Sequence, residues 1–191
     1  MVNNTRLTVA VFGGSFDPPH QGHQQIVIEV LKHLNIDKLI ILPTYLNPFK
    51  SSSLSGASQR FKWCKDLFSN TPKVIVSDYE IKQNRSVKTV ESIKYFQKYY
   101  NVQYLIIGSD NLSTVTQWYN FNWLNKEITW VVVTRPGFSL ITQMLNSWKL
   151  LTLNMPISSS QIKKSGQTEY IDKKIVSSVK YILKGQSLND N

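Results

Sequence analysis

Short apolar runs alternate along this chain with longer segments in which apolar residues recur every three or four positions. A short apolar run between turn-forming residues is typical of a strand buried on both faces, and the longer period is typical of a helix packed on such strands. The apolar runs predict strands at residues 7–12, 38–42, 74–77, 104–108, 128–134 and 150–153. The periodic segments predict helices over residues 20–34, 59–68, 89–99 and 172–183.

The repeated order of strand, helix and strand predicts the fold class. A right-handed crossover through a helix makes the two flanking strands parallel. Repeating it gives an α/β protein with a Rossmann-like parallel sheet flanked by helices. The chain has 191 residues, 41% hydrophobic and 18% charged, which suits one globular domain with its own core. We therefore expect a single domain over residues 1–191, with 1–6 and 186–191 as frayed tails.

Composition also bounds the cellular setting. No apolar run approaches the roughly 20 residues of a membrane helix, and the first residues lead straight into the first strand, so we expect neither a membrane partner nor a secretory signal. The one cysteine, Cys64, cannot form an internal disulfide and lies beside Trp63 in a helical pattern. We expect it to be buried packing rather than a nucleophile. These features predict a cytoplasmic protein.

The chain is strongly basic, with a formal net charge of +10 at pH 7. Such a charge favours phosphorylated or polyanionic partners, nucleic acid included. The lysines are scattered, however, with the densest pairs at Lys163-Lys164 and Lys173-Lys174, and no basic segment interleaved with aromatic residues stands out. A non-enzymatic nucleic-acid-binding module therefore ranks last among the functions considered, and no nucleic-acid partner is expected.

The candidate chemistry is concentrated between the first strand and the first helix, in the segment Gly13-Gly14-Ser15-Phe16-Asp17-Pro18-Pro19-His20-Gln21-Gly22-His23. Its glycines let the backbone approach a ligand, its prolines stiffen the loop, and the free N–H groups of the following helix start favour an anion. His20 and His23, three positions apart, share one face of that first turn. A plain glycine-proline turn would leave the histidines unexplained, and zinc would need further ligands nearby. The segment predicts phosphate binding.

This segment resembles the HxGH nucleotidyltransferase superfamily, and its form GGSFDPPHQGH is similar to that of the bacterial nicotinate-nucleotide adenylyltransferases in particular. The related pantetheine-phosphate adenylyltransferases and cytidylyltransferases share the histidines but have a different lead-in. Further matching segments lie at residues 43–50, 84–93, 108–119, 134–138 and 157–163. The resemblance implies the nucleotidyltransferase fold and an enzyme of NAD biosynthesis, which transfers AMP from ATP to nicotinate mononucleotide and releases pyrophosphate.

The resemblance, together with the residue patterns, gives a set of expected site residues. The expected catalytic residues are His20, His23, Lys50 and Lys163. The residues expected to bind ATP are Gly13, Gly14, Ser15, Phe16, His20, Gly22, His23, Gly108, Asp110, Arg135, Ile157, Ser158, Ser159 and Ser160. The residues expected to bind the pyridine nucleotide are Ser15, Phe16, Lys50, Thr89, Trp118 and Tyr119.

A long polar loop, residues 44–56, follows the second predicted strand. It could be a plain surface connector, but loops of this length often cover sites. By resemblance, Lys50 within it meets the nucleotide phosphates. Ser58 is expected to cap the next helix, and Arg60 to face the loop. Whether the loop closes on substrate stays open.

Two segments carry the expected pyridine contacts. Thr89 either caps a helix or, as the resemblance implies, meets the pyridine carboxylate through its backbone, and both roles can hold. Lys88 stands where the family has tyrosine. Trp118 either packs in the core or, as in the family, stacks on the nicotinate ring while the backbone of Tyr119 meets the carboxylate. The choice between nicotinate and nicotinamide mononucleotide stays open.

Further candidates lie at the carboxyl ends of predicted strands, where α/β sheets place ligands. Asp110 is expected to accept hydrogen bonds from a ribose or to help hold a hydrated metal, although it could merely cap a helix. Arg135 is expected to face a phosphate or stack on adenine. Residues 158–160 form a second expected phosphate cradle at a helix start. Ser160 and Lys163 stand there in place of the family's threonine and arginine.

The expected reaction is direct attack of the acceptor's 5′-phosphate on the α-phosphorus of ATP, which requires positioning and charge neutralisation. A covalent histidine intermediate is the second option. Mg²⁺ is the expected cofactor, bound through the ATP phosphates rather than by a protein metal site. Adenylyl transfer to phosphopantetheine, or transfer of CMP, is the alternative within enzymes. A homodimer is one option for the assembly.

Overall fold

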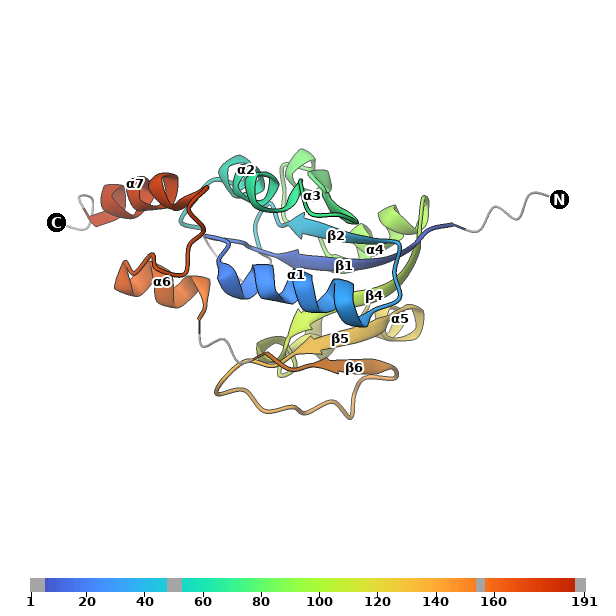
Figure 1. Ribbon diagram of the computed structural model, residues 1–191. Coiled ribbons are helices and arrows are strands. Elements are labelled where there is room, and N and C mark those ends of the chain that lie inside the picture. Colours follow the sequence, from blue (N-terminus) through green and yellow to red (C-terminus); the bar gives the residue numbers. More distant parts are fainter. Residues whose placement is uncertain (1–5, 48–52, 154–156, 188–191) are drawn as a thin grey trace.

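The computed structural model describes residues 6–47, 53–153 and 157–187. Its centre is a six-stranded sheet in the order β3-β2-β1-β4-β5-β6, in which every neighbouring pair is parallel (Figure 1). The strands are β1 (Thr8–Gly14), β2 (Lys38–Pro43), β3 (Val74–Val76), β4 (Asn101–Gly108), β5 (Thr129–Val133) and β6 (Trp148–Leu151). The predicted Rossmann-like parallel sheet is confirmed, and its strand order reverses direction between β1 and β4.

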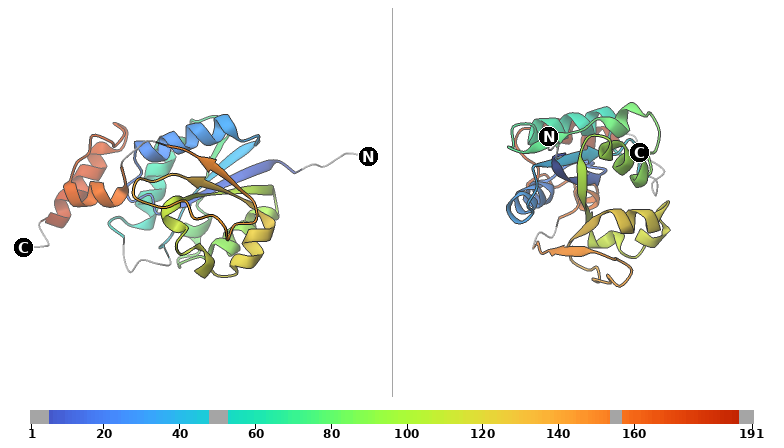
Figure 2. Two further views of the ribbon diagram at one scale, coloured as in Figure 1. Left: turned by 90° about the horizontal axis from the view of Figure 1, so that it is seen from below. Right: turned by 90° about the vertical axis from the view of Figure 1, so that its right-hand side faces the viewer.

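Helices cover both faces of this sheet (Figure 2). They are α1 (Gln21–His33), α2 (Ala57–Phe68), α3 (Tyr79–Lys82), α4 (Thr89–Gln97), α5 (Phe121–Glu127), α6 (Ser159–Ser165) and α7 (Val176–Ser187), with one-turn 3₁₀ helices η1 (Ser109–Asn111) and η2 (Val115–Gln117).

Strand β1 shows why both faces are covered. Successive side chains of a strand point to opposite faces. Ala10 and Phe12 join the core formed with α1, α2 and α7, whereas Val9 and Val11 join the core formed with α4 and α5. All four side chains are buried. The uninterrupted apolar run of β1 therefore marks a strand that has no solvent-facing side.

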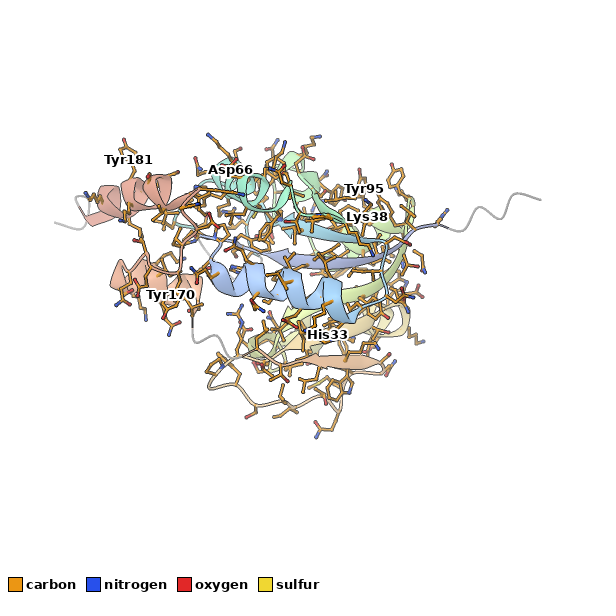
Figure 3. The ribbon with its side chains drawn as sticks, in the orientation of Figure 1. His33, Lys38, Asp66, Tyr95, Tyr170 and Tyr181 are labelled. Atoms are coloured by element: carbon orange, nitrogen blue, oxygen red, sulfur yellow. The ribbon has the colours of Figure 1, made fainter. Side chains whose placement is uncertain are left out.

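Helices α6 and α7 extend the molecule beyond the carboxyl ends of the strands (Figure 1). The segment between them is held against the start of α1, because the Gln21 N–H donates to the Tyr170 carbonyl at 2.9 Å. Val179 of α7 is buried, while Tyr181 projects into solvent (Figure 3). Within the described part of the chain, none of the helices combines the length and apolar character needed to cross a membrane.

Two helix starts differ from their prediction. α2 has Gly56 as its N-cap, since the N–H groups of Gln59 and Arg60 both donate to the Gly56 carbonyl. Ser58 therefore lies within the first turn, and its prediction as the cap is wrong.

Helix α4 likewise has Lys88 as its N-cap, and Thr89 is the first helical residue. Glu91 accepts the Lys88 N–H at 3.0 Å, so a glutamate three residues into the helix closes this turn. The alternative in which Thr89 serves as the cap is therefore wrong.

Other boundaries shift for identifiable reasons. Segment 78–88, in which no helix was predicted, contains α3, whose Tyr79 stacks on Tyr95 of α4. The last helix begins at Val176 rather than at residue 172, because Asp172 Oδ1 accepts the Lys174 N–H and forms a local turn that competes with helix.

Strand β6 ends at Leu151 rather than at residue 153 because its pairing with β5 stops where Leu151 lies opposite Val133. Strand β4 begins at Asn101, three residues before its predicted start, because its first residues pair with β1 and the Asn101 N–H donates to the Leu7 carbonyl.

Candidate active site

A cavity of about 530 Å³ lies at the carboxyl ends of the central strands, beside the point where the strand order reverses. Open α/β sheets bind ligands at this place. The predicted site residues that line it are Gly13, Gly14, Ser15, Phe16, His23, Thr89, Asp110, Trp118, Tyr119, Arg135, Ser158, Ser159 and Ser160. The fold therefore gathers predicted residues from the whole length of the chain around one space.

The other predicted residues are not part of this wall. His20, Gly22, Gly108, Ile157 and Lys163 lie outside the cavity lining, and Lys50 lies outside the described residues. His20 contacts the wall, because its ring lies 3.9 Å from the His23 ring, centroid to centroid.

The two histidines form a buried pair at the start of α1. The His20 backbone N–H donates to His23 Nδ1 at 3.2 Å, which assigns the proton of His23 to Nε2. Both side chains are buried, and neither ring nitrogen of His20 has a hydrogen-bond partner among the described residues. An unpaired buried ring at a cavity is available to a ligand.

The environment keeps both rings uncharged at neutral pH. Burial, with the positive charge of Arg135 as a second cause, lowers the pKa of His20 to about 3. Burial first, and then His20 and Arg135, hold the pKa of His23 well below its usual value of 6.5. In the ligand-free protein each ring is a neutral imidazole with one N–H donor and one acceptor.

Glycines fix the packing around these rings. A Cβ on Gly22 would lie 3.0 Å from the His20 ring and 3.3 Å from Ile157, so any larger residue would displace one of them. A Cβ on Gly14 would lie 3.2 Å from the Phe16 ring, which itself packs 4.9 Å from the His23 ring. The phosphate-binding segment is therefore close-packed as well as stiff.

The start of α6 is tied to the same segment. Ser159 Oγ donates to the Pro18 carbonyl at 2.9 Å, and Lys163 Nζ lies 3.3 Å from Asp17 Oδ2. Lys163 is thus adjacent to the loop, but its ammonium group is paired with the buried Asp17 carboxylate. Its contact with phosphate stays a prediction.

A second cation–carboxylate pair lies in the cavity wall. Arg135 Nε lies 3.1 Å from Asp110 Oδ1, and the Arg135 N–H donates to Ser109 Oγ. Gly108 lies beneath this pair, where a Cβ would collide with Asp110 Oδ1 and with Arg135 Nε. The predicted roles of Asp110 with the ribose and Arg135 with phosphate or adenine remain predictions.

Arg60 has a larger structural role than facing the loop. Its side chain is 1% exposed and donates to four backbone carbonyls at 2.6–3.0 Å. The acceptors belong to Ser15, Thr44, Tyr45 and Ser55. One guanidinium thus joins the phosphate-binding segment to both ends of loop 44–56.

Asp17 completes this junction from the other side. Its carboxylate accepts the backbone N–H groups of Leu54 and Ser55 at 2.8 and 3.0 Å, in addition to its pair with Lys163. The sequence does carry a signal for Arg60, because it shares the buried i, i+3, i+4 stripe of α2 with Trp63 and Cys64. A charged residue on such a stripe must find partners inside the fold.

The acceptor side of the cavity is aromatic and acidic. Trp118 packs edge-on against Trp130 at 6.0 Å, and its Nε1 is buried without a partner among the described residues. It is both a packing residue and a wall of the cavity, whereas Tyr119 is exposed. Glu80 of α3 and Ser92 of α4 also line the cavity. Neither was predicted as a site residue, and α3, which carries Glu80, was not predicted at all.

Comparisons with known proteins agree with this geometry. A sequence model of the family described as cytidylyltransferase-like matches residues 11–165. A protein named probable nicotinate-nucleotide adenylyltransferase from Sulfurovum sp. (strain NBC37-1) is 55% identical over 184 residues, covering 96% of this chain and 98% of that protein. One of the same name from Campylobacter jejuni (strain RM1221) is 43% identical over 176 residues, covering 91% and 95%.

Among solved structures, the fold is similar to that of the Plasmodium falciparum nicotinic acid mononucleotide adenylyltransferase complexed with NaAD, with a TM-score of 0.72 at 20% identity over 96% of this chain and 97% of that one. This likeness supports the fold, and the sequence relatives carry the family assignment. The chain belongs to the cytidylyltransferase-like family and, within it, to the nicotinate-nucleotide adenylyltransferases.

Proposed function

We propose that this protein transfers the adenylyl group of ATP to nicotinate mononucleotide, giving nicotinate adenine dinucleotide and pyrophosphate for NAD biosynthesis. The observation that carries the proposal is the shared cavity, which the glycine segment and His23 line on one side and Thr89 and Trp118 on the other. At about 530 Å³ it falls within the usual range for small-molecule sites. The names of the sequence relatives point to the same reaction.

In the proposed step, an oxygen of the acceptor's 5′-phosphate attacks the α-phosphorus of ATP. A phosphorus–oxygen bond forms there, the bond from the α-phosphorus to the bridging oxygen breaks, and pyrophosphate leaves with that electron pair. The attacking oxygen is already anionic near neutral pH, so no general base is needed. The protein must align two anions and stabilise the charge that builds on the α-phosphoryl oxygens.

The described residues suit those two tasks. The unpaired His20 ring and the adjacent His23 offer N–H donors beside the glycine segment. A bound phosphate would raise the pKa of both rings, since a nearby negative charge favours the imidazolium. Arg135 lines the cavity and Lys163 lies beside the loop, so permanent positive charge is also at hand. This arrangement supports direct transfer without a covalent histidine intermediate.

Mg²⁺ is the cofactor we propose, held by the triphosphate oxygens of ATP. Over residues 6–47, 53–153 and 157–187, no three His, Cys, Asp or Glu side chains gather as a metal-binding group. Asp17 and Asp110 are each paired with a cation. This donor set fits an ion that arrives on ATP and keeps water ligands, with Asp110 as the side chain able to hold one of those waters. When bound, the ion neutralises phosphate charge.

We further propose a cytoplasmic location and small-molecule partners only. Cys64, the one cysteine of the chain, is buried, and burial raises the pKa of its thiol, which suits a packing residue in a reducing compartment. A homodimer is an additional prediction, which light scattering of the purified protein would check.

The test is a reaction of the purified protein with ATP, Mg²⁺ and one acceptor at a time, following pyrophosphate release and the dinucleotide product. Turnover with nicotinate mononucleotide is the expected result. Turnover only with phosphopantetheine, or only when CTP replaces ATP, would keep the chemistry and overturn the acceptor or donor. A folded protein that binds ATP but releases no pyrophosphate with any acceptor would favour the nucleic-acid-binding alternative, which salt-sensitive RNA binding would then identify.

A further inference from the structure

Glu80 is a buried acidic side chain in the wall of the substrate cavity. It belongs to the short helix α3 and is 4% exposed. Its Oε1 accepts a hydrogen bond from Ser92 Oγ of α4 at 2.8 Å, whereas its Oε2 has no partner among the described residues. A buried polar atom without a partner carries a free-energy penalty, and at a cavity a ligand can relieve it.

Ser92, which donates a hydrogen bond to Glu80, also shows where Glu80 lies relative to the expected pyridine site. Ser92 lies three residues after Thr89, so both project from the same side of α4, one turn apart. Glu80, Thr89 and Trp118 line one cavity. A pyridine ring stacked on Trp118 with its substituent near Thr89 would therefore bring that substituent to the region of Glu80.

The surroundings of Glu80 favour its protonated form. Burial is the first cause that raises its pKa, to about 7, and the negative charge of Glu91 acts in the same direction. The hydrogen bond from Ser92 and the positive charge of Arg60 act against it. Tyr79, the preceding residue, also lies near this carboxyl group. Near neutral pH the carboxyl group is therefore present in both its protonated and its ionised form.

We propose that Glu80 is a specificity-determining residue that donates a hydrogen bond, as the neutral acid, to the ring carboxylate of nicotinate mononucleotide. The inference rests on the proposed function and adds to it a proton that is taken up when the acceptor binds. The ionised form of Glu80 instead accepts an N–H of an amide, so protonation of this one group selects between the acid and amide forms of the acceptor.

Proton balance distinguishes the two acceptors. At pH 8 the free protein has Glu80 about nine-tenths ionised, given a pKa of about 7. Nicotinate mononucleotide then binds with uptake of about 0.9 proton by this group, and with about 0.1 at pH 6. Nicotinamide mononucleotide, which binds the ionised form, instead releases about 0.1 proton at pH 8. Because both acceptors carry the same 5′-phosphate, subtracting one uptake from the other removes any contribution of the phosphate.

The first experiment is calorimetry of the full chain in buffers of different ionisation enthalpy, with each mononucleotide in the presence of a non-hydrolysable ATP analogue. The expected result is an uptake for the acid, relative to the amide, of about one proton at pH 8. The difference should vanish in Glu80→Gln, which keeps the shape and can donate an N–H at every pH. Equal uptake for both acceptors in the wild type would overturn the proposal.

Kinetics give an independent reading of the same group. Between pH 6 and pH 8 the ratio of kcat/KM for the acid to kcat/KM for the amide should fall about 100-fold, because the value for the acid falls about tenfold and the value for the amide rises about tenfold. In Glu80→Gln this ratio should not change with pH. Ser92→Ala is the matched variant, because losing a hydrogen bond that lowers the pKa of Glu80 moves the midpoint of each acceptor's own pH profile to higher pH. A purely structural Glu80 would leave the ratio independent of pH in the wild type and in both variants, while the substitutions lower the Tm.

These outcomes are separate from failure of the proposed function. If no pyridine mononucleotide supports pyrophosphate release, the adenylyltransferase assignment fails whatever Glu80 does. If turnover occurs but the acid-to-amide ratio does not depend on pH, only the role of Glu80 fails.

Discussion

The two sides of the cavity differ in how their polar side chains are held. On the side of the glycine segment, which we call the phosphate side, the described cations Arg135 and Lys163 have carboxylate partners, Asp110 and Asp17. On the acceptor side, Glu80 Oε2 and Trp118 Nε1 are buried without a partner among the described residues. When a ligand binds, we expect Arg135 and Lys163 to exchange a carboxylate partner for a phosphate. We expect Glu80 and Trp118 instead to gain a partner that they lack.

This difference indicates which side of the cavity determines affinity and which side determines selectivity between acceptors. A cation that exchanges a carboxylate for a phosphate discriminates little between ligands, because every phosphorylated ligand offers it the same negative charge. A buried polar group without a hydrogen-bond partner discriminates strongly between ligands. A ligand that cannot form a hydrogen bond with it leaves the free-energy cost of its burial uncompensated. We therefore expect variants on the phosphate side to lower the rate with every acceptor, and variants on the acceptor side to change the choice of acceptor.

The largest effect is expected from His20→Ala. Loss of one donor to a developing phosphoryl charge lowers kcat by about 10²–10³-fold, equally with both pyridine mononucleotides. The matched control is His33→Ala, since His33 lies at the far end of α1, pairs with Glu29 and is largely exposed (Figure 3). Steady-state kinetics of the two variants check this, and similar losses in both would remove the special role of the buried pair.

Arg60→Ala should cost about 3 kcal/mol of unfolding free energy, because four backbone carbonyls lose a buried donor. The Tm would fall by about 6–12 °C. Arg85→Ala is the control, because Arg85 forms an exposed pair with Glu91 and should leave the Tm nearly unchanged. Thermal unfolding followed by circular dichroism measures the Tm of both variants. Equal stability of the two variants would contradict the junction role of Arg60.

The two sides should also respond to acid in opposite directions. The folded-state pKa of His20 lies below its unfolded value, so the unfolded chain binds more protons and stability falls as pH drops from 6.5 to 4.5, by about 2.3 kcal/mol. The folded-state pKa of Glu80 lies above its unfolded value, so over the same interval stability rises by a similar amount as pH drops.

Single substitutions separate these opposing contributions. His20→Asn should leave a protein whose unfolding free energy increases toward pH 4.5 relative to the wild type, and Glu80→Gln one whose unfolding free energy decreases. Urea denaturation of the three proteins at pH 4.5 and 6.5 measures both slopes. Parallel slopes for all three would show that neither group titrates as its surroundings imply.

The smallest effect is expected from Trp118→Ala. Loss of stacking on a heterocycle raises the KM for the pyridine mononucleotide by about tenfold and leaves the KM for ATP unchanged. Trp148→Ala on the edge strand β6 is the control, because Trp148 is exposed and away from the cavity wall. A KM that rises for both substrates would mean that the two sides of the cavity are not independent.

The phosphate side could be predicted from sequence because its parts are neighbours in the chain. Strand end, glycines, helix start and both histidines fall within residues 13–23, so local rules of turn and helix geometry suffice. The same holds for the sheet, since each buried strand is a continuous apolar run. Asp110 and Arg135 could be proposed because they follow such runs directly.

The acceptor side and the loop junction could not be read in this way. Glu80 acquires its meaning from Ser92, twelve positions away on another helix, and from a cavity that only the folded chain encloses. Arg60 bonds to carbonyls up to 45 positions away. Backbone carbonyls occur at every residue, so the sequence cannot show which of them a buried guanidinium will reach.

The junction at Arg60 has a consequence for how this chain tolerates changes in length. Carbonyls of Thr44, Tyr45 and Ser55 bond to the same guanidinium, so the two ends of the intervening segment have a fixed separation. Closing a longer loop between fixed ends costs only about 0.6 kcal/mol for each doubling of its length. Added length between Asn47 and Leu54 should therefore leave the Arg60 junction formed, and any loss of activity would come through the position of Lys50 rather than through the two anchored ends.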